Sequence, residues 1–242
     1  PVKAPGPGPI SRAEALDLIA LPPSDLPALL ARAESVRRAA FGDAVRLCAI
    51  SNAKSGRCAE RCDFCAQSSA FDTGAPVYPM KAPAAILEEA RRAASAGARR
   101  FSIVTSGRTI KSRKDVSAVV EAVRLIRSET DLEACASLGD VSGDLLERLK
   151  GVGLSRYHHN VETAPSFHAS IVHTHAWDDE VRVVREAAAI GLETCCGGIL
   201  GMGETPAQRV ELALALADVG PGAVPLNFLD PRPGPPLESL PV

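Results

Sequence analysis

The chain has 242 residues, with 27 Lys and Arg against 29 Asp and Glu, so its formal net charge is 27 − 29 = −2. This near balance argues against a general binder of nucleic acid or of anionic membranes, because both depend on a concentrated excess of positive charge. Hydrophobic residues make up 46% of the sequence and charged residues 23%. These values are typical of a globular chain with a sizeable core and exclude a disordered or collagen-like protein.

The sequence predicts neither a membrane span nor a secretory signal. Its longest apolar stretches, such as residues 210–219, are much shorter than the roughly 20 residues that cross a bilayer. No basic segment followed by an apolar run begins the sequence, so we expect a cytoplasmic protein. The seven cysteines of such a chain indicate metal binding or catalysis rather than disulfides, because cytosolic thiols stay reduced.

Short β-rich runs and amphipathic helices alternate along most of the chain. Residues 1–10 are rich in Pro and Gly and are interpreted as a flexible lead-in. Two helices are expected next, at 11–20 and 24–40, each beginning at a serine N-cap. Strands are then expected at residues 45–51, 100–105, 132–137, 154–160, 192–196 and 224–228, and helices at 83–96, 114–127, 142–150, 178–189 and 205–217.

Six strands that alternate with helices predict parallel βα units with right-handed crossovers. A closed TIM-type barrel needs eight strands and about 250 residues. Here residues 1–42 are expected to form an N-terminal helical extension, and 43–242 have room for about six units. We therefore expect an incomplete TIM-type α/β barrel, either open on one side or truncated at its C-terminus. Truncation is favoured, because residues 231–242 show no helix or strand pattern.

Three cysteines lie in one loop after the first predicted strand. Cys58, Cys62 and Cys65 have the spacing CxxxCxxC. Three thiolates from a tight loop can bind three irons of a 4Fe-4S cluster and leave the fourth iron free for a substrate or cofactor. A zinc site would need a fourth protein ligand, and the loop contains neither another Cys nor a His. Chance clustering of reduced thiols is the remaining interpretation.

Longer motifs surround these cysteines and continue along the chain. They are NAKSGRC at 52–58, FCAQS at 64–68, LEAC at 132–135, YHHNVET at 157–163, CCGGILGMGET at 195–205 and VPLN at 224–227. Together they resemble the biotin synthase family of the radical S-adenosylmethionine (SAM) enzymes, from about residue 12 to the end. The CxxxCxxC spacing alone marks only the superfamily, whereas the later motifs are specific to the family.

The resemblance implies a role for the cysteine loop. Cys58, Cys62 and Cys65 would hold a 4Fe-4S cluster whose open iron binds SAM, and an electron from the cluster would cleave SAM to a 5′-deoxyadenosyl radical. Phe64 would then lie beside the adenine of SAM. A core aromatic residue is the competing interpretation of Phe64.

The resemblance also implies residues that contact SAM and the substrate. Asn160 and Glu162 should point to the same side at the end of the fourth strand, and they would touch both molecules. Glu162 stands where many relatives have Asp, and strand-end capping is the alternative role for the pair. Asn227 would hydrogen-bond the ureido ring of dethiobiotin. The remaining SAM-binding residues implied are Gly197, Gly198, Gly201, Gly203 and Glu204, although any tight βα turn can use such glycines.

Four histidines are not expected to act in the site. His158 and His159 are adjacent on a predicted strand, so they should point in opposite directions and cannot both face one site. We expect both to have a structural role or to support the ligating residues without contacting the bound group themselves. His173 and His175 lie in a predicted loop with no partner pattern, and we expect them to be solvated at the surface.

The family takes its sulfur from an auxiliary iron–sulfur cluster inside the barrel. Cys135 and Cys195 match two of its three usual cysteines, but Ser102 stands at the third and is a poor ligand for a soft metal. The usual arginine ligand has no counterpart here. We therefore hypothesise a different auxiliary cluster, as in a variant subtype, held by some or all of Cys48, Cys135, Cys195 and Cys196. Cys195 and Cys196 are adjacent, so their side chains should face opposite sides of a strand unless the strand bulges. For each of the four cysteines, the alternative is a buried free thiol without a ligand role.

The resemblance thus implies an enzyme that inserts sulfur into dethiobiotin to form biotin. It also implies flavodoxin or ferredoxin as electron donor and a homodimer, without nucleic acid or membrane partners. One alternative is another radical SAM enzyme of the same barrel, a mutase or a cofactor-maturation enzyme, which would need no sulfur donor. The other is a non-catalytic iron–sulfur or zinc protein, which would form no 5′-deoxyadenosine from SAM.

Overall fold

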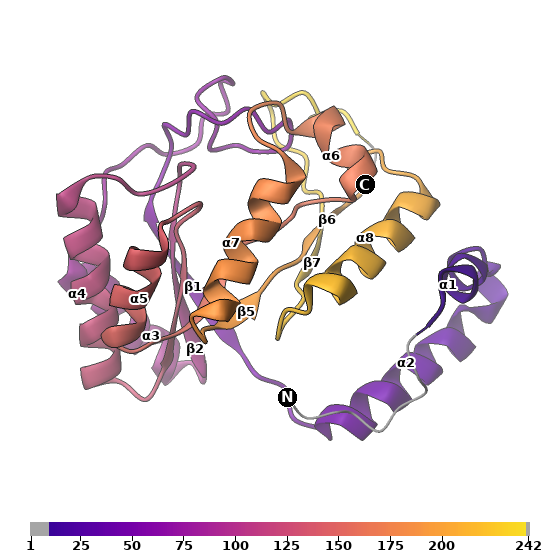
Figure 1. Ribbon diagram of the computed structural model, residues 1–242, viewed down its shortest axis with the longest axis horizontal. Coiled ribbons are helices and arrows are strands. Elements are labelled where there is room, and N and C mark those ends of the chain that lie inside the picture. The colour runs from indigo at the N-terminus through magenta and orange to yellow at the C-terminus, as the bar shows by residue number, and fades with distance from the viewer. Residues whose placement is uncertain (1–9, 241–242) are drawn as a thin grey trace.

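Parallel strands and covering helices alternate in the computed structural model, which describes residues 10–240 (Figure 1). The strands are β1 (Cys48–Lys54), β2 (Arg100–Thr105), β3 (Glu133–Ser137), β4 (Leu154–His158), β5 (Glu193–Cys195), β6 (Gly198–Leu200) and β7 (Leu226–Phe228). The helices are α1 (Arg12–Ile19), the 3-10 helix η1 (Pro23–Asp25), α2 (Leu26–Phe41), α3 (Pro83–Ser95), α4 (Arg113–Glu129), α5 (Gly143–Gly151), α6 (Pro165–Ile171), α7 (Trp177–Ala189) and α8 (Pro206–Val219).

The strands form two sheets, and every strand pair in them is parallel. Five of them are paired in the order β1-β2-β3-β4-β5, and β6 pairs with β7. Single bridges join the two groups: Glu162 pairs with Gly198, and Cys195 pairs with Ala223. Within residues 10–240, β1 and β7 are not paired with each other. The predicted βα units are therefore confirmed, and they form an open part of a TIM-type barrel.

The predicted fifth strand, 192–196, corresponds to β5, and a further strand that was not predicted, β6, follows after Cys196 and Gly197. The two glycines at this point lie against neighbouring backbone. A Cβ on Gly197 would lie 1.8 Å from the carbonyl oxygen of Pro225, and a Cβ on Gly198 would lie 2.4 Å from that of Glu162. Since real Cβ contacts are never this short, only glycine allows the chain to cross between its two neighbours here.

Several element boundaries differ from the sequence-based expectation. The first strand lies at 48–54 instead of 45–51, because its pairing with β2 begins at Cys48. The fourth strand ends at His158 rather than at residue 160. Helix α6 was not predicted, since seven residues are too few to show a helical period. The second helix begins at Leu26 after η1 and has no side-chain cap, because the Ser24 hydroxyl bonds to Asp25 instead. The lead-in at residues 1–9 lies outside the described residues.

Helices α3, α4, α5 and α7 cover the outer face of the sheet (Figure 1). Phe101 and Ile103 of β2 are at most 1% exposed and pack in one apolar cluster with Ile86 of α3 and Val123 of α4. Because strand residues alternate between faces, the intervening residues of β2 point inward. Val104 accordingly lines an internal cavity. This alternation separates the apolar core from the inner surface that carries the polar and sulfur-bearing side chains.

The N-terminal helices lie on the far side of α8 from the strands (Figure 1). Helix α1 packs on α8, where Ile19 borders an apolar groove formed with Leu212 and Leu216. The serine cap predicted for this helix is present, since the Ser11 hydroxyl accepts a hydrogen bond from the Glu14 amide at 3.2 Å. No helix in the described part of the chain is both long enough and apolar enough to cross a membrane.

The hydroxyl of Tyr157 in β4 supports the neighbouring loop and offers a test of the core. It donates to the carbonyl of Gly139 at 2.6 Å and accepts from the amide of Leu138 at 3.3 Å, in a side chain that is 1% exposed. Tyr157→Phe removes the partner of the Leu138 amide, whereas the Gly139 carbonyl keeps the Val141 amide at 3.1 Å. We therefore expect the free energy of unfolding in urea to fall by about 1–3 kcal/mol. The control is Tyr78→Phe, whose half-buried hydroxyl donates to Asn52 at 2.9 Å. Equal losses for the two variants would contradict the prediction.

Candidate functional site

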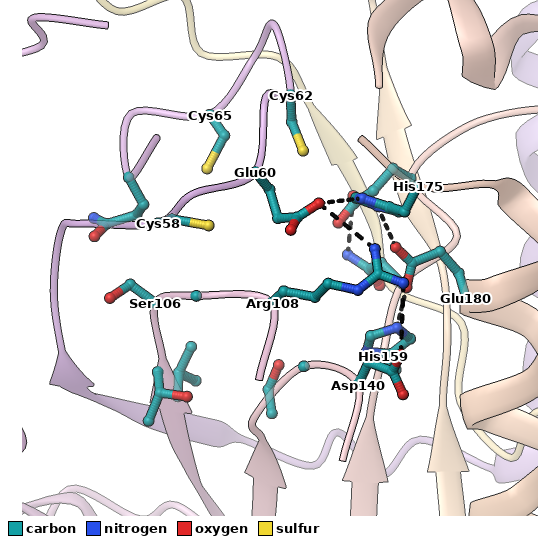
Figure 2. Close-up of a pocket in the computed structure, with 18 of the residues that line it drawn as sticks. Cys58, Glu60, Cys62, Cys65, Ser106, Arg108, Asp140, His159, His175 and Glu180 are labelled. Carbon is teal, nitrogen blue, oxygen red and sulfur yellow. Dashed lines mark hydrogen bonds and ion pairs between the residues drawn. The ribbon is translucent and has the colours of Figure 1, made fainter. Parts of the chain in front are cut away.

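A cavity of about 310 Å³ lies at the C-terminal ends of the strands, beside the loop that carries the three cysteines (Figure 2). Its walls come from this cysteine loop (residues 58–67), the loops after β2, β3 and β4, and the first turn of α7. TIM barrels and open parallel sheets place their ligands at this end of the strands. The lining side chains that matter for its chemistry are Cys58, Glu60, Cys62, Phe64, Cys65, Arg108, Asp140, His158, His159, Asn160, Glu162, His175 and Glu180.

The cysteine loop holds its three thiols on one side of this cavity. The Cys58 amide donates to the carbonyl of Gln67 at 3.1 Å, and the Cys58 carbonyl accepts from the amide of Ser69 at 2.8 Å. The Cys65 amide donates to the Cys62 carbonyl at 2.9 Å, which closes a tight turn between the second and third cysteines. Figure 2 shows the three sulfur atoms directed into the same space. The structure therefore brings together the three cysteines that the spacing singled out.

Polar contacts anchor this loop to the strand ends. The side-chain oxygen of Gln67 accepts from the hydroxyl of Ser55 at 3.0 Å and from the amide of Gly56 at 2.5 Å. The Ser106 hydroxyl after β2 donates to the Gly56 carbonyl at 2.7 Å. Gln67 thus has a structural reason to follow the third cysteine, because it closes the loop onto the end of β1.

The environment of the thiols favours a soft metal. Burial, together with the nearby Cys58 and Cys65, raises the pKa of Cys62 far above its usual range, and burial also raises the pKa of Cys65. Such thiols stay protonated in the metal-free protein, and they ionise when a thiophilic cation takes the place of the protons. Three sulfur donors from one loop fit a 4Fe-4S cluster that keeps one iron open.

The predicted pair Asn160 and Glu162 lies together on the cavity wall. The Asn160 side-chain oxygen accepts from the amide of Gly197 at 3.1 Å, and its NH2 group donates to the Glu162 carboxylate at 3.4 Å. The strand has already ended at His158, so alternation does not align them. Glu162 instead has φ 62°, a left-handed conformation that is uncommon for a non-glycine residue. This turn directs its carboxylate back to the cavity.

Glu162 provides a test of the electrostatics of the cavity. Burial, followed by the nearby charge of Glu180, raises the pKa of Glu162 from 4.5 to about 7. Between these values the folded state holds a proton that the unfolded state has lost, so stability falls as pH rises through this window. In the cluster-free protein, Glu162→Gln should therefore raise the free energy of unfolding at about pH 8 and change it little at about pH 5. The difference 7 − 4.5 = 2.5 corresponds to at most about 3 kcal/mol.

Urea unfolding at the two pH values measures this effect. Glu147→Gln on α5 is the control, since its carboxylate is exposed. Equal effects of Glu162→Gln at both pH values would show that the carboxylate does not carry a buried charge.

A charged network borders the cavity on the side away from the cysteines (Figure 2). The two ring nitrogens of His175 contact Glu60 at 2.7 Å and Glu180 at 2.5 Å. Glu180 also pairs with His159, and Arg108 lies 3.5 Å from Glu60. Arg108 further approaches Asp140 and Asp179, both at 3.5 Å. This network joins the cysteine loop to the loop after β2 and to the start of α7.

Two of the histidine predictions were wrong. The side chain of His175 is only 8% exposed, so the expectation of a solvated surface histidine was wrong. His158 and His159 both line the cavity, because β4 ends at His158 and the chain turns there. The prediction that they cannot face one site was therefore also wrong. His173 is exposed, as expected for a surface histidine, and it pairs with Asp63 at 2.9 Å.

The glycine-rich segment supports the cavity from behind. Of the predicted SAM residues, Gly197, Gly198, Gly201, Gly203 and Glu204 do not line the cavity, whereas Phe64 does. The Glu204 carboxylate instead accepts from the amides of Gly201 and Met202, both at 2.8 Å, and pairs with Arg209 at 2.7 Å. It therefore closes its own turn. Asn227 lies on the exposed strand β7 and does not line the cavity either.

Three of the four remaining cysteines share the inner surface of the sheet. Burial raises the pKa of Cys135 to about 12 and that of Cys195 to about 11, and the nearby Cys48 raises both further. The three thiols of β1, β3 and β5 thus lie near one another. Cys196 is 0% exposed and belongs to an apolar cluster with Val161 on the other side of the strand. The structure does not bring Cys196 together with the other three.

Basic and acidic side chains accompany these inner cysteines, and sequence reasoning missed them. Arg100 lies 2.9 Å from Glu193, which also pairs with Arg156. His158 has a ring nitrogen 3.2 Å from the sulfur of Cys195, and burial lowers the pKa of this histidine to about 4. The inner face beside the thiols is therefore polar and carries a neutral imidazole.

Sequence reasoning also missed Glu60, Arg108 and Glu180 in the cavity wall. These residues come from two loops and from helix α7, which are far apart in the chain, and no local spacing connects them. One signal in the sequence pointed to this part of the wall: three of the five histidines fall within residues 168–175, and one of them, His175, contacts both Glu60 and Glu180.

Comparison with known proteins shows the family to which this chain belongs. The family model of the radical SAM superfamily matches residues 53–216. A biotin synthase of Anaeromyxobacter dehalogenans is 52% identical over 238 residues, covering 98% of this chain and 66% of that protein. A biotin synthase of Nitratidesulfovibrio vulgaris is 49% identical over 249 residues, covering 96% of this chain and 68% of that protein. The chain thus spans about two thirds of the length of the curated relatives it matches.

Solved structures show the same fold. Methylornithine synthase superposes with a TM-score of 0.85 at 21% identity, over 96% of this chain and 68% of that structure. The FeFe-hydrogenase maturase HydG from Carboxydothermus hydrogenoformans superposes with a TM-score of 0.77 at 21% identity, over 91% of this chain and 53% of that structure. The open parallel sheet, the three-cysteine loop and the family match together define a member of the radical SAM superfamily. Within this superfamily, the chain belongs to the biotin synthase family.

Proposed function

We propose that this chain is a radical SAM enzyme of the biotin synthase type, which inserts sulfur into dethiobiotin to form biotin. The convergence of three loop thiols on a cavity at the carboxyl end of the sheet carries the proposal. Family membership suggests the reaction, and the cavity is the proposed location of this reaction.

Cys58, Cys62 and Cys65 would hold the 4Fe-4S cluster. When bound, this cluster supplies the electron that cleaves SAM to a radical able to remove hydrogen from an unactivated carbon. The protein itself binds SAM and shields the cluster from solvent. Asn160 presents an amide and Glu162 a carboxylate on the same wall, which suits the hydroxyl and ammonium groups of SAM. These two residues can orient a polar cofactor while the loop covers the metal.

Phe64 adds an apolar wall beside the third cysteine, where it can pack on an adenine ring. The role predicted for Asn227 in substrate binding stays a prediction. Its side chain lies on an exposed strand next to the open side of the sheet.

We further propose that Cys48, Cys135 and Cys195 bind an auxiliary iron–sulfur cluster that donates the sulfur. They share the inner face of the sheet, and His158 lies close enough to Cys195 to contribute to the same site. Cys196 is left out because it is packed in the outer core. Ser102 pairs in register with Cys135, so a hydroxyl stands where a thiol would have extended the set.

Residual metal tests the auxiliary cluster. A variant with alanine at Cys58, Cys62 and Cys65 should keep iron and sulfide after anaerobic reconstitution. Adding Cys135→Ala to it should remove most of that iron, whereas adding Cys196→Ala should not. A triple variant without iron would overturn the auxiliary site and leave the SAM-binding site untouched.

The family also supports a cytoplasmic location, flavodoxin or ferredoxin as electron donor, and a homodimer. Size-exclusion chromatography with light scattering tests the dimer, and reduction assays with each donor test the electron source.

The reaction is tested anaerobically with reduced, reconstituted protein, SAM and dethiobiotin. Mass spectrometry should find both 5′-deoxyadenosine and biotin. Formation of 5′-deoxyadenosine without sulfur in the product would favour a mutase or a cofactor-maturation enzyme on the same barrel. Absence of 5′-deoxyadenosine would favour a non-catalytic iron–sulfur protein.

A further inference from the structure

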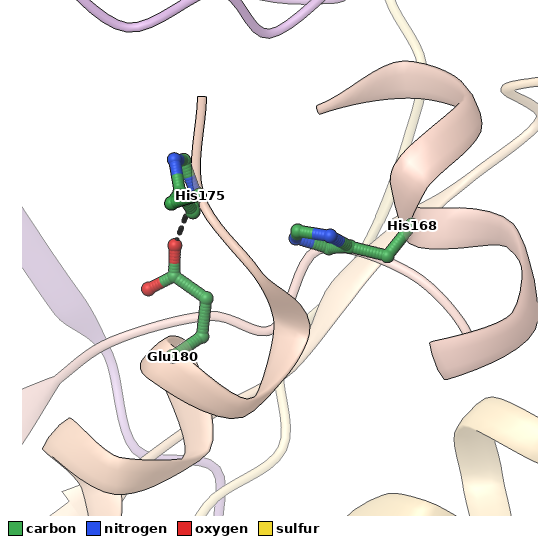
Figure 3. Close-up of side chains that lie close together, drawn as sticks. All are labelled: His168, His175 and Glu180. Atoms are coloured by element: carbon green, nitrogen blue, oxygen red, sulfur yellow. Dashed lines mark ion pairs between the residues drawn. The ribbon is translucent and has the colours of Figure 1, made fainter. Parts of the chain in front are cut away.

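A second group of metal-ligating side chains lies next to the cavity and involves none of the cysteines. His168 of α6, His175 before α7 and Glu180 of α7 each place one ligand atom within 4.8 Å of the others (Figure 3). The rings of His168 and His175 meet edge to face with centroids 5.7 Å apart. All three side chains point toward one another between the two helices.

His168 is the unexplained member of this group. It is 2% exposed, and its Nε2 atom is buried without a hydrogen-bond partner. An unpaired polar nitrogen in such a place is costly unless something binds it. Burial also lowers the pKa of His168, which keeps the ring neutral with a lone pair available.

The other two side chains are oriented as metal ligands usually are. One nitrogen of His175, Nδ1, lies 2.7 Å from the Glu60 carboxylate, and the other, Nε2, faces Glu180 at 2.5 Å. A carboxylate that accepts a proton from one ring nitrogen fixes the second nitrogen as the ligand, which is the common carboxylate–histidine–metal arrangement. Glu180 is ionised: although burial opposes this, hydrogen bonds from His159 and His175 lower its pKa to about 2.

We propose that His168, His175 and Glu180 form a divalent metal site, with Zn²⁺ as its best-fitting ion and Glu60 as the carboxylate that orients His175. Two imidazoles and one carboxylate are a known zinc donor set that leaves a fourth position for water. On binding, the ion replaces the proton that His175 now shares with Glu180, and that proton passes to solvent. Ligand atoms around tetrahedral zinc lie about 3.3 Å apart, and those of the present group lie within 4.8 Å of one another, so the side chains would move closer on binding.

The position of the site indicates what the ion would do. His175 and Glu180 line the cavity, whereas His168 lies behind them. The ion would therefore join α6 to the start of α7 and, through Glu60, to the cysteine loop. This role does not depend on the proposed reaction, because none of the three ligands is needed to hold an iron–sulfur cluster.

Zinc content tests the proposal in the full chain with its clusters reconstituted. After addition of Zn²⁺ and removal of the loosely bound ion, elemental analysis should find one more zinc per chain in the wild type than in His168→Phe. His173→Gln is the matched control, since this histidine is near in sequence but pairs with Asp63 outside the group. It should keep the zinc.

A second variant guards against misfolding of His168→Phe. Glu60→Gln keeps the shape of the orienting side chain and should weaken zinc binding by about 10- to 100-fold. In the difference spectrum between wild-type protein with and without Co²⁺, ligand-field absorption should appear without new sulfur-to-cobalt charge transfer. Equal zinc content in the wild type and His168→Phe, unchanged affinity in Glu60→Gln, or a sulfur-bound cobalt spectrum would each overturn the site. These readouts do not involve SAM cleavage, so they are separate from a failure of the proposed function.

Discussion

Cys62→Ala is expected to abolish reductive cleavage of SAM by this chain while leaving the protein folded. Cys62 sits in the middle of the three-cysteine loop, and its thiol is directed into the cavity with those of Cys58 and Cys65 (Figure 2). A cluster with an open iron needs all three thiolates, because each caps a different iron. Loss of a residue that only hydrogen-bonds a metal ligand typically lowers metal affinity or activity by about 10- to 100-fold. Loss of a direct ligand should therefore lower 5′-deoxyadenosine formation by at least about 100-fold.

The measurement combines iron and sulfide content with 5′-deoxyadenosine quantified by mass spectrometry. Cys196→Ala is the matched control, since this cysteine is buried in the outer apolar core and lies off the cavity. It should keep both the cluster and SAM cleavage. Normal cleavage by Cys62→Ala would refute the assignment of the loop.

Gly197→Ala is expected to cost at least about 3 kcal/mol of folding free energy. The added Cβ would lie 1.8 Å from the carbonyl oxygen of Pro225 and 2.8 Å from its carbonyl carbon. Both partners are backbone, so no side-chain rotation relieves the contact, and the strands must separate. Overpacking costs 1–3 kcal/mol when side chains adjust, and more when the backbone has to move. Separation would also break the hydrogen bond that the Gly198 amide donates to the Pro225 carbonyl, now 3.2 Å long.

Urea denaturation followed by circular dichroism measures this loss. Gly151→Ala is the control, because a Cβ there meets nothing within 4 Å at the end of α5. Alanine at that position should be neutral or stabilising by roughly 0.5–1 kcal/mol. Similar midpoints for the two variants would show that the close approach at Gly197 can relax.

Much of the fold was visible in the sequence because it follows from local patterns. The alternation of β-rich runs and amphipathic helices predicted the parallel βα units, and the sheet order confirms them. Prediction failed where contacts with neighbouring strands determine the bounds of an element. The first strand begins at Cys48 because β2 offers pairing only from there. Strand β6 was not predicted, because it is defined by its pairing with β7, which lies further along the chain.

The candidate site was predictable to the extent that its residues are close in the chain. The spacing of Cys58, Cys62 and Cys65 places three thiols in one short loop, so their convergence needs no long-range information. The pair Asn160 and Glu162 was also found, although the left-handed turn at Glu162 aligns them instead of strand alternation.

The number and spacing of the cysteines in the sequence by themselves determined that this protein carries a three-thiol loop and a second, dispersed set of thiols. Which of the dispersed thiols meet was decided only by the tertiary structure. Cys195 and Cys196 are adjacent in sequence, but one faces the inner surface and the other the apolar core. The charged network of Glu60, His175 and Glu180 likewise exists only in the folded chain. It joins loops separated by more than a hundred residues, and the packing of α6 and α7 brings them together because parallel strands end at the same edge of the sheet.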